Sequence, residues 1–109
     1  MQVTYQKFRL GTIVMTPAVE QRLRDNNDTE GTAAMQLAAM FVAHASGDWG
    51  DIDDEDKKEN DEAVTHGRRI LSAYAIALDG DRRGYGDNCV WIITEADRSV
   101  TTALLPSEY

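Results

Sequence analysis

The chain has 109 residues, of which 42% are hydrophobic and 28% charged, and its formal net charge is −8. This length is near the commonest size of one domain, so we expect a single domain over residues 1–109. The acidic balance argues against direct binding to nucleic acid or anionic membranes. No apolar run approaches the ~20 residues that span a bilayer. The lone Cys89 and the absence of a signal-peptide pattern favour a cytoplasmic setting.

The first part of the chain predicts one strand and two helices. Gly11–Met15 is a β-branched run typical of a strand. Thr16 and Pro17 then predict a helix start, because threonine can cap free N–H groups and proline tolerates the first helical position. Thr32–Ser46 is the strongest helical segment, and its apolar residues leave little polar face. We therefore expect it to be a central, mostly buried helix.

A third helix is predicted over Asp53–His66, and it carries most of the charge. The block from Gly47 to Glu62 holds nine carboxylates and two lysines, for a net charge of −7. Carboxylates in the first turn complement the helix dipole. The helix has few apolar residues, so it needs an anchor elsewhere in the fold, and Trp49 is the obvious candidate.

Three strands are predicted in the last third, over Arg69–Leu78, Cys89–Thr94 and Ser99–Leu105. A glycine-rich loop and a tight turn join them into an antiparallel meander. Alternation in the first of these strands places its alanines on one face, and we expect a helix to pack closely there. The predicted fold class is α+β, with three helices packed on a small antiparallel sheet, which is a C-terminal three-stranded meander with an optional N-terminal strand.

The acidic helix is the first candidate binding site. Carboxylates gathered on one helix face would suit a basic protein surface and steer its association. A tryptophan on a tight turn is a common interface anchor. The candidate contact residues are Trp49, Asp51, Asp53, Asp54, Glu55, Glu59 and Glu62. The plainer interpretations are a solvated helix face and a buried Trp49 that fills a gap in the core, and composition favours both.

No metal or cofactor is expected. A calcium loop beginning at Asp51 would need glycine at its sixth position, where the chain has Asp56. His44 and His66 lie on different elements without metal-site spacing, so we interpret both as structural. Cys89 opens an apolar strand and is interpreted as a small buried hydrophobe.

A polar turn between the last two strands is the second candidate site. Glu95, Asp97, Arg98 and Thr101 would form a small-ligand or enzyme site at the end of the sheet. The plainer interpretation has Asp97 bonded to its own turn and Glu95 paired with Arg98. An enzyme is therefore the less favoured class, although this turn keeps that alternative open.

Three segments, Gly47–Val64, Arg69–Ile76 and Trp91–Tyr109, resemble a group of small proteins encoded on plasmids, phages and integrated elements of bacteria. The group has no established activity to carry over, but the resemblance implies a setting in mobile DNA. Small acidic proteins of such elements often inhibit host defence, including restriction and CRISPR complexes. We therefore expect a non-enzymatic accessory protein that binds a basic protein partner through the acidic helix. The alternatives are the polar-turn site and a structural or oligomerisation domain, such as a homodimer.

Overall fold

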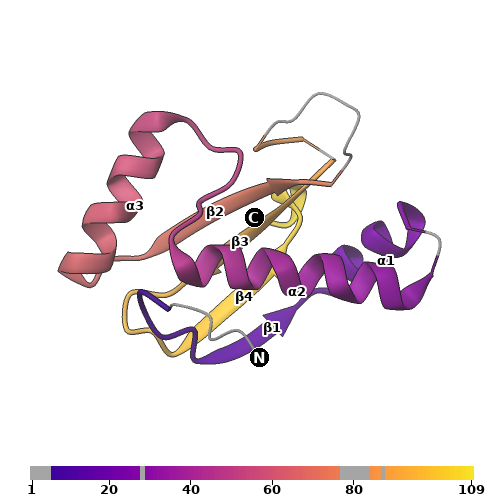
Figure 1. Cartoon of the computed structure of the whole chain (residues 1–109), viewed down its shortest axis with the longest axis horizontal. Coiled ribbons are helices and arrows are strands. Elements are labelled where there is room, and N and C mark those ends of the chain that lie inside the picture. The colour runs from indigo at the N-terminus through magenta and orange to yellow at the C-terminus, as the bar shows by residue number, and fades with distance from the viewer. Residues whose placement is uncertain (1–5, 28, 77–83, 87) are drawn as a thin grey trace.

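A computed structural model describes residues 6–27, 29–76, 84–86 and 88–109 of the protein. Helices α1 and α2 cover one face of a four-stranded sheet, and α3 lies beside one of its edges (Figure 1). This arrangement confirms the predicted α+β class with three helices and a C-terminal meander. The elements are β1 (Thr12–Met15), α1 (Pro17–Asp25), α2 (Glu30–Ser46), α3 (Asp54–His66), β2 (Ile70–Ala75), β3 (Cys89–Thr94), β4 (Val100–Leu104) and a 3₁₀ turn (Pro106–Glu108).

Local signals explain where the helices begin and end. The Asp53 carboxylate caps α3 by accepting the backbone N–H three residues on, at 2.8 Å. Thr29 caps α2 in the same way, so this helix begins before the predicted Thr32. Gly47 ends α2 at φ 88°, and Gly67 ends α3 at φ 69°, both in the left-handed region where glycine is unstrained.

The strand order is β1-β4-β3-β2, which leaves β1 and β2 at the two edges. Strands β2, β3 and β4 form the predicted antiparallel meander. Strand β1 pairs in parallel with β4, placing Thr12 opposite Val100, so the sheet is mixed rather than purely antiparallel. The additional N-terminal strand that the sequence allowed is therefore part of the sheet. The predicted end of β2 at Leu78 lies outside the described residues.

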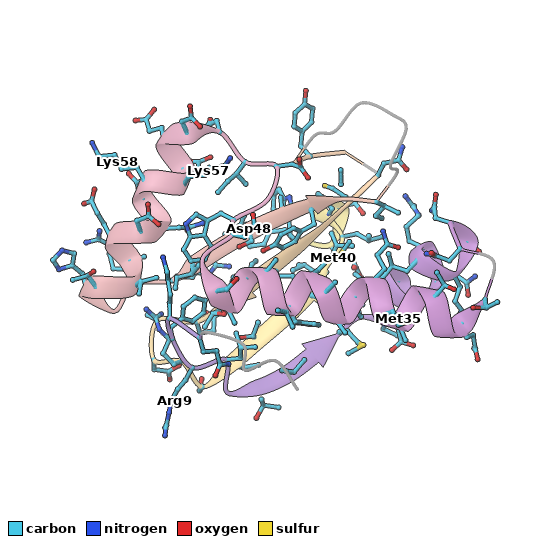
Figure 2. All side chains as sticks on the ribbon, viewed as in Figure 1. Arg9, Met35, Met40, Asp48, Lys57 and Lys58 are labelled. Atoms are coloured by element: carbon cyan, nitrogen blue, oxygen red, sulfur yellow. The ribbon has the colours of Figure 1, made fainter. Side chains whose placement is uncertain are left out.

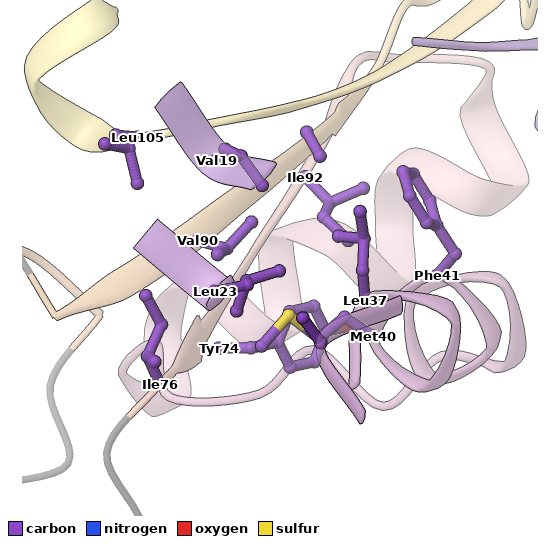
Figure 3. Close-up of a cluster of buried hydrophobic side chains, with 12 residues drawn as sticks. Val19, Leu23, Leu37, Met40, Phe41, Tyr74, Ile76, Val90, Ile92 and Leu105 are labelled. Carbon is purple, nitrogen blue, oxygen red and sulfur yellow. The ribbon is translucent and has the colours of Figure 1, made fainter. Parts of the chain in front are cut away.

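The helices pack on the opposite face of β2 from the one predicted. Tyr74 and Ile76, not the alanines, join the core beneath α1 and α2 (Figure 3). The alanine face instead accommodates backbone, since a Cβ placed on Gly84 would lie 3.1 Å from the Cβ of Ala73. Trp91 Nε1 also donates to the Gly84 carbonyl at 2.7 Å. Small residues here admit a loop, while larger side chains fill the wider space between sheet and helices.

Helix α2 is buried on one side only. Leu37, Met40 and Phe41 point into the core with the sheet residues (Figure 3), and each contributes roughly 1.5–3 kcal/mol by burial. On the outer side, Met35 is 75% exposed and Val42 is 47% exposed. The prediction of a mostly buried helix was therefore wrong. Its shortage of polar residues produces an exposed apolar surface instead.

Candidate functional site

Helix α3 is attached to the edge of β2 by one asparagine. Asn60 Nδ2 donates to the Leu71 carbonyl at 2.7 Å, and Asn60 Oδ1 accepts from the Leu71 amide at 3.3 Å. Asn60 is buried, with 6% of its surface exposed. An unpaired buried backbone group costs about 1–3 kcal/mol. The side-chain amide thus satisfies the edge strand and also sets the rotation of α3 about its axis.

Trp49 anchors the segment that precedes α3. The indole is only 3% exposed and packs with Ala63 and Ile70. Its Nε1 donates to the Asp61 carboxylate at 2.9 Å, and its ring stacks on Phe8 with the centroids 6.1 Å apart. Trp49 is therefore a core residue, as the plainer interpretation held, and its ring is not available as an exposed interface anchor.

The backbone around Trp49 adds a short parallel bridge to β2. The Ala73 amide donates to the Trp49 carbonyl at 3.3 Å, and the Asp51 amide donates to the Ala73 carbonyl at 2.6 Å. The Asp51 carboxylate accepts from the Ala75 amide at 2.8 Å. Asp51 therefore belongs to the edge of the sheet rather than to the outer surface of α3.

Arg98 closes the other end of α3. Its guanidinium donates to the carbonyls of Ala63 and Arg68, at 3.0 and 2.6 Å, where the helix ends. It also donates to the Glu95 and Ala96 carbonyls of its own turn, at 3.2 and 3.3 Å. A cation at a helix C-terminus is favoured by the helix dipole. The residue adopts φ 61°, an uncommon conformation for a side chain of this size.

The remaining residues of the polar turn do not converge on a site. Asp97 accepts from the Ser99 amide and hydroxyl at 3.0 and 2.6 Å, and these hydrogen bonds lower the pKa of Asp97. Glu95 lies 3.8 Å from Arg69, instead of pairing with the arginine of its own turn as the plainer interpretation had it. Thr101 is fully buried. Each side chain supports the local fold.

Four of the candidate contact residues are exposed carboxylates of α3 and form what we call the acidic face, although one of them, Glu59, also borders the cleft between α3 and β2. Among the described residues, the only ion pair made by these four joins Glu62 to Arg68 at 3.9 Å. Both partners are more than half exposed, so this pair contributes little to stability. Lys58 projects into solvent from the same helix (Figure 2). The acidic face consists of Asp54, Glu55, Glu59 and Glu62, whereas Trp49, Asp51 and Asp53 stabilise the fold.

Sequence reasoning missed a buried chain of hydrogen bonds between α2 and the sheet. His44 Nδ1 lies 2.6 Å from Ser72 Oγ, and His44 Nε2 lies 2.8 Å from Thr94 Oγ1. Thr94 and Thr101 hydroxyls are 2.7 Å apart, and Thr101 donates to the Leu10 carbonyl at 2.6 Å. Because the Thr101 hydroxyl donates its only proton to that carbonyl, the Thr94 hydroxyl must donate to Thr101. His44 Nε2 therefore carries the imidazole proton, and Nδ1 accepts from Ser72.

His44 is held neutral at the centre of this chain. Burial, and secondarily the positive charge of Arg98, lowers its pKa from 6.5 to about 3. His44 and the three hydroxyl-bearing residues are fully buried, which confirms the structural interpretation of His44. The only hint in the sequence was the placement of Ser72 and two threonines at inward positions of otherwise apolar strands.

Besides a smaller cavity of about 340 Å³ between α2 and β2, two larger surface cavities border the helices. A cleft of about 510 Å³ between α3 and the start of β2 carries Asp56, Glu59, Arg68 and Arg69, so its charges balance. A groove of about 550 Å³ between β1, α1 and α2 is mainly apolar. Neither cavity is lined by residues of the polar turn. The sequence did not predict the groove, because it brings together elements that are separately amphipathic.

The described residues show no other reactive centre. No three His, Cys, Asp or Glu side chains among them are placed to bind a metal ion. Burial, followed by the charge of Asp51, raises the pKa of the free Cys89 thiol to about 11, which makes it a poor nucleophile. No described helix has the length and apolarity needed to cross a bilayer. Protein-family models, curated proteins and solved structures give no match to the chain.

Proposed function

We propose that the chain is a non-enzymatic binding protein that docks a basic protein surface on the acidic face of α3. The observation that carries this proposal is that one side of α3 is attached to the sheet while its exposed carboxylates have few partners. Its inner side is attached to β2 through Asn60, while its outer carboxylates make one weak ion pair among the described residues. A pre-positioned helix reduces the ordering cost of binding, and its negative field speeds association.

We infer that the partner's basic surface is one that ordinarily holds nucleic acid. A row of carboxylates on a rigid helix presents negative charges as a phosphate backbone does. The resemblance to proteins of mobile elements supports the same choice of partner. By occupying such a surface, the protein acts as an accessory of a mobile genetic element and inhibits a host defence system, in the manner of an anti-CRISPR or anti-restriction protein.

The polar-turn alternative has less support. The Arg98 guanidinium donates to backbone carbonyls, and Thr101 is buried in the hydrogen-bond chain. Asp97 and Glu95 keep exposed carboxylate surface, but Asp97 bonds to Ser99 and Glu95 pairs with Arg69, so the two acids do not converge on one site. We therefore place the function on α3.

Two variants with equal net charge test the proposal. The first neutralises the acidic face with Asp54→Asn, Glu55→Gln, Glu59→Gln and Glu62→Gln. The control neutralises four surface acids elsewhere, with Glu20→Gln, Asp25→Asn, Glu30→Gln and Glu95→Gln. Since each variant removes four negative charges, a difference between them reports the position of the charge and not its total.

Each immobilised chain is used to capture proteins from a bacterial extract that contains nuclease defence complexes, and affinities are then measured with the purified partner. The native chain and the control should retain the partner, while the α3 variant should lose at least about tenfold in affinity. Binding should weaken between roughly 0.05 and 0.5 M salt. Equal binding by both variants would contradict the proposal. It would also be contradicted if the partner bound to α3 and the activity of the restriction or CRISPR system did not change.

A further inference from the structure

Among the described residues, strand β1 presents an edge that no other strand covers. The amides of Thr12 and Thr16 donate to carbonyls of Ser99 and Ala103, at 3.0 and 3.1 Å, on the β4 side. Backbone groups alternate in direction along a strand, so those of Ile13 and Met15 point outward. Within the described residues, no strand pairs with this side of β1. Open edges of this kind accept another strand readily.

An apolar surface adjoins that edge. Ile13 and Met15 line the groove of about 550 Å³ together with Ala34, Ala38 and other residues of α2. From Gly31 to Ser46, α2 contains no Asp, Glu, Lys or Arg. Figure 2 shows Met35 projecting from α2 on the side of β1. Edge and groove therefore form one surface with backbone groups to pair and apolar side chains to bury.

The charge distribution favours a second copy of the chain as the occupant of this surface. The protein carries a net charge of −8, so two copies repel each other over most approaches. The residues of β1 are uncharged, and α3 lies at the opposite edge of the sheet (Figure 1). The groove beside β1 carries Glu20, Arg24 and Glu30, and Arg24 pairs with both acids. Contact through β1 therefore joins surfaces of low net charge and keeps the two acidic faces far apart.

We propose that the protein forms a two-fold dimer in which the β1 strands of two copies pair antiparallel and extend the sheet. A two-fold axis perpendicular to the sheet keeps each side chain on its own face, so opposite residues must share that face. Pairing Val14 with Val14 of the second copy places Ile13 opposite Met15. The outward N–H and C=O groups of Ile13 and Met15 are then all satisfied, and Ile13 and Met15 of each copy fill the groove of the other.

The available area is consistent with such an interface. The exposed fractions are 48% for Ile13, 41% for Val14, 36% for Met15, 75% for Met35 and 47% for Val42. Ile13, Val14 and Met15 correspond to roughly 250 Å², and Met35 and Val42, which do not line the groove, bring the total to roughly 500 Å². A standard interface buries about 800 Å² per partner. The β1 backbone and the exposed alanines of α2 supply further area.

Sedimentation of the full chain tests the association. At about 0.1 mM, where a dimer with a Kd near 1 μM is almost fully formed, the protein should sediment at twice its 12.1 kDa. Val14→Lys should raise the dissociation constant by at least about tenfold, because it places two like charges directly opposite each other at the two-fold axis. Thr65→Lys on the exposed side of α3 is the matched control and should leave the dimer intact.

Cysteine cross-linking tests the register. Val14→Cys should form a disulfide-linked dimer on mild oxidation, because opposed residues of this type have Cα atoms about 4.5 Å apart. Ile13→Cys and Thr65→Cys should not, since their equivalent positions lie too far apart to be bridged. The native Cys89 is buried and does not compete. A monomeric native chain at about 0.1 mM, or linkage through Ile13→Cys but not Val14→Cys, would overturn the proposal.

Discussion

The two edges of the sheet are treated in opposite ways. At β2, the outward amides of Leu71, Ala73 and Ala75 all have partners within the chain, supplied by Asn60 and by residues 49–51. At β1, no described strand pairs with the outer side. One edge is closed by side chains that also position a charged helix. The other stays open beside an apolar groove. This difference is the basis of our proposal that the β1 edge is a contact surface.

The largest change in the free energy of unfolding should come from removing Trp49, the anchor of the closed edge. Trp49→Ala should lower the free energy of unfolding by about 3–5 kcal/mol, because a buried aromatic ring is lost and a cavity remains. Val14→Ala at the open edge is the control and should cost under about 0.5 kcal/mol in the monomer. Urea unfolding of both variants at protein concentrations well below the proposed dissociation constant of the dimer measures each cost without a contribution from association. Similar costs at the two edges would refute the contrast.

The second prediction concerns the hydrogen-bond chain that joins the two edges through His44. The pKa of His44 is about 3 when folded, against 6.5 for the free side chain, so between these values the unfolded state binds the extra proton. The stabilisation is complete above pH 6.5 and is lost as the pH falls toward 3. The stabilisation lost between pH 6.5 and pH 4 amounts to about 3 kcal/mol.

Unfolding measured over this pH range in the native chain, in His44→Gln and in His66→Gln isolates the effect. The His44 variant should be less stable near neutral pH and should lose less further stability on acidification. His66 is exposed at the end of α3, and its variant should follow the native curve. A native curve parallel to that of His44→Gln would contradict a neutral, buried imidazole.

A somewhat smaller effect is expected from Asn60. Replacing it by alanine leaves the Leu71 amide and carbonyl without these partners at a partly buried edge, at a cost of about 2–3 kcal/mol. Asn26→Ala, which removes an exposed side-chain bond to Arg22 at the end of α1, should cost about 1 kcal/mol or less. Thermal or urea unfolding distinguishes the two. An equal cost would mean that α3 is attached mainly by other contacts.

The smallest effect on stability should come from Val14→Lys. Val14 is 41% exposed in the monomer, so the substitution should change its free energy of unfolding by no more than about 0.5 kcal/mol. The same substitution should abolish the concentration dependence of the native unfolding midpoint. Loss of monomer stability by several kcal/mol would show that this edge supports the fold and is not reserved for contact.

Most of the architecture was accessible from the sequence because caps and strand patterns are local signals. Asp53, Gly47 and Gly67 end or begin helices where expected. The parallel pairing of β1 with β4 was not accessible, since it joins residues nearly ninety positions apart. Both errors about faces came from size. The small alanines of β2 were expected to pack under a helix, but they make room for a loop. The apolar helix α2 was expected to be mostly buried, but one of its sides is exposed.

The candidate site was accessible only in part. The sequence located the acidic helix, but it could not separate acids that bond to the protein's own backbone, such as Asp51, from acids that face solvent, such as Glu59. That separation depends on the bridge from residues 49–51 to β2 and on the rotation of α3, which Asn60 sets through a contact with the same strand. The His44 chain was hidden for a similar reason, because its members come from α2 and three strands.

Amide hydrogen exchange measured at several protein concentrations tests the contrast between the edges most directly. The account predicts that the amides of Leu71 and Ala73 are protected at every concentration. The amides of Ile13 and Met15 should exchange rapidly in dilute solution and become protected as the concentration rises. Protection of Ile13 and Met15 that does not depend on concentration, or rapid exchange at Ala73, would contradict it.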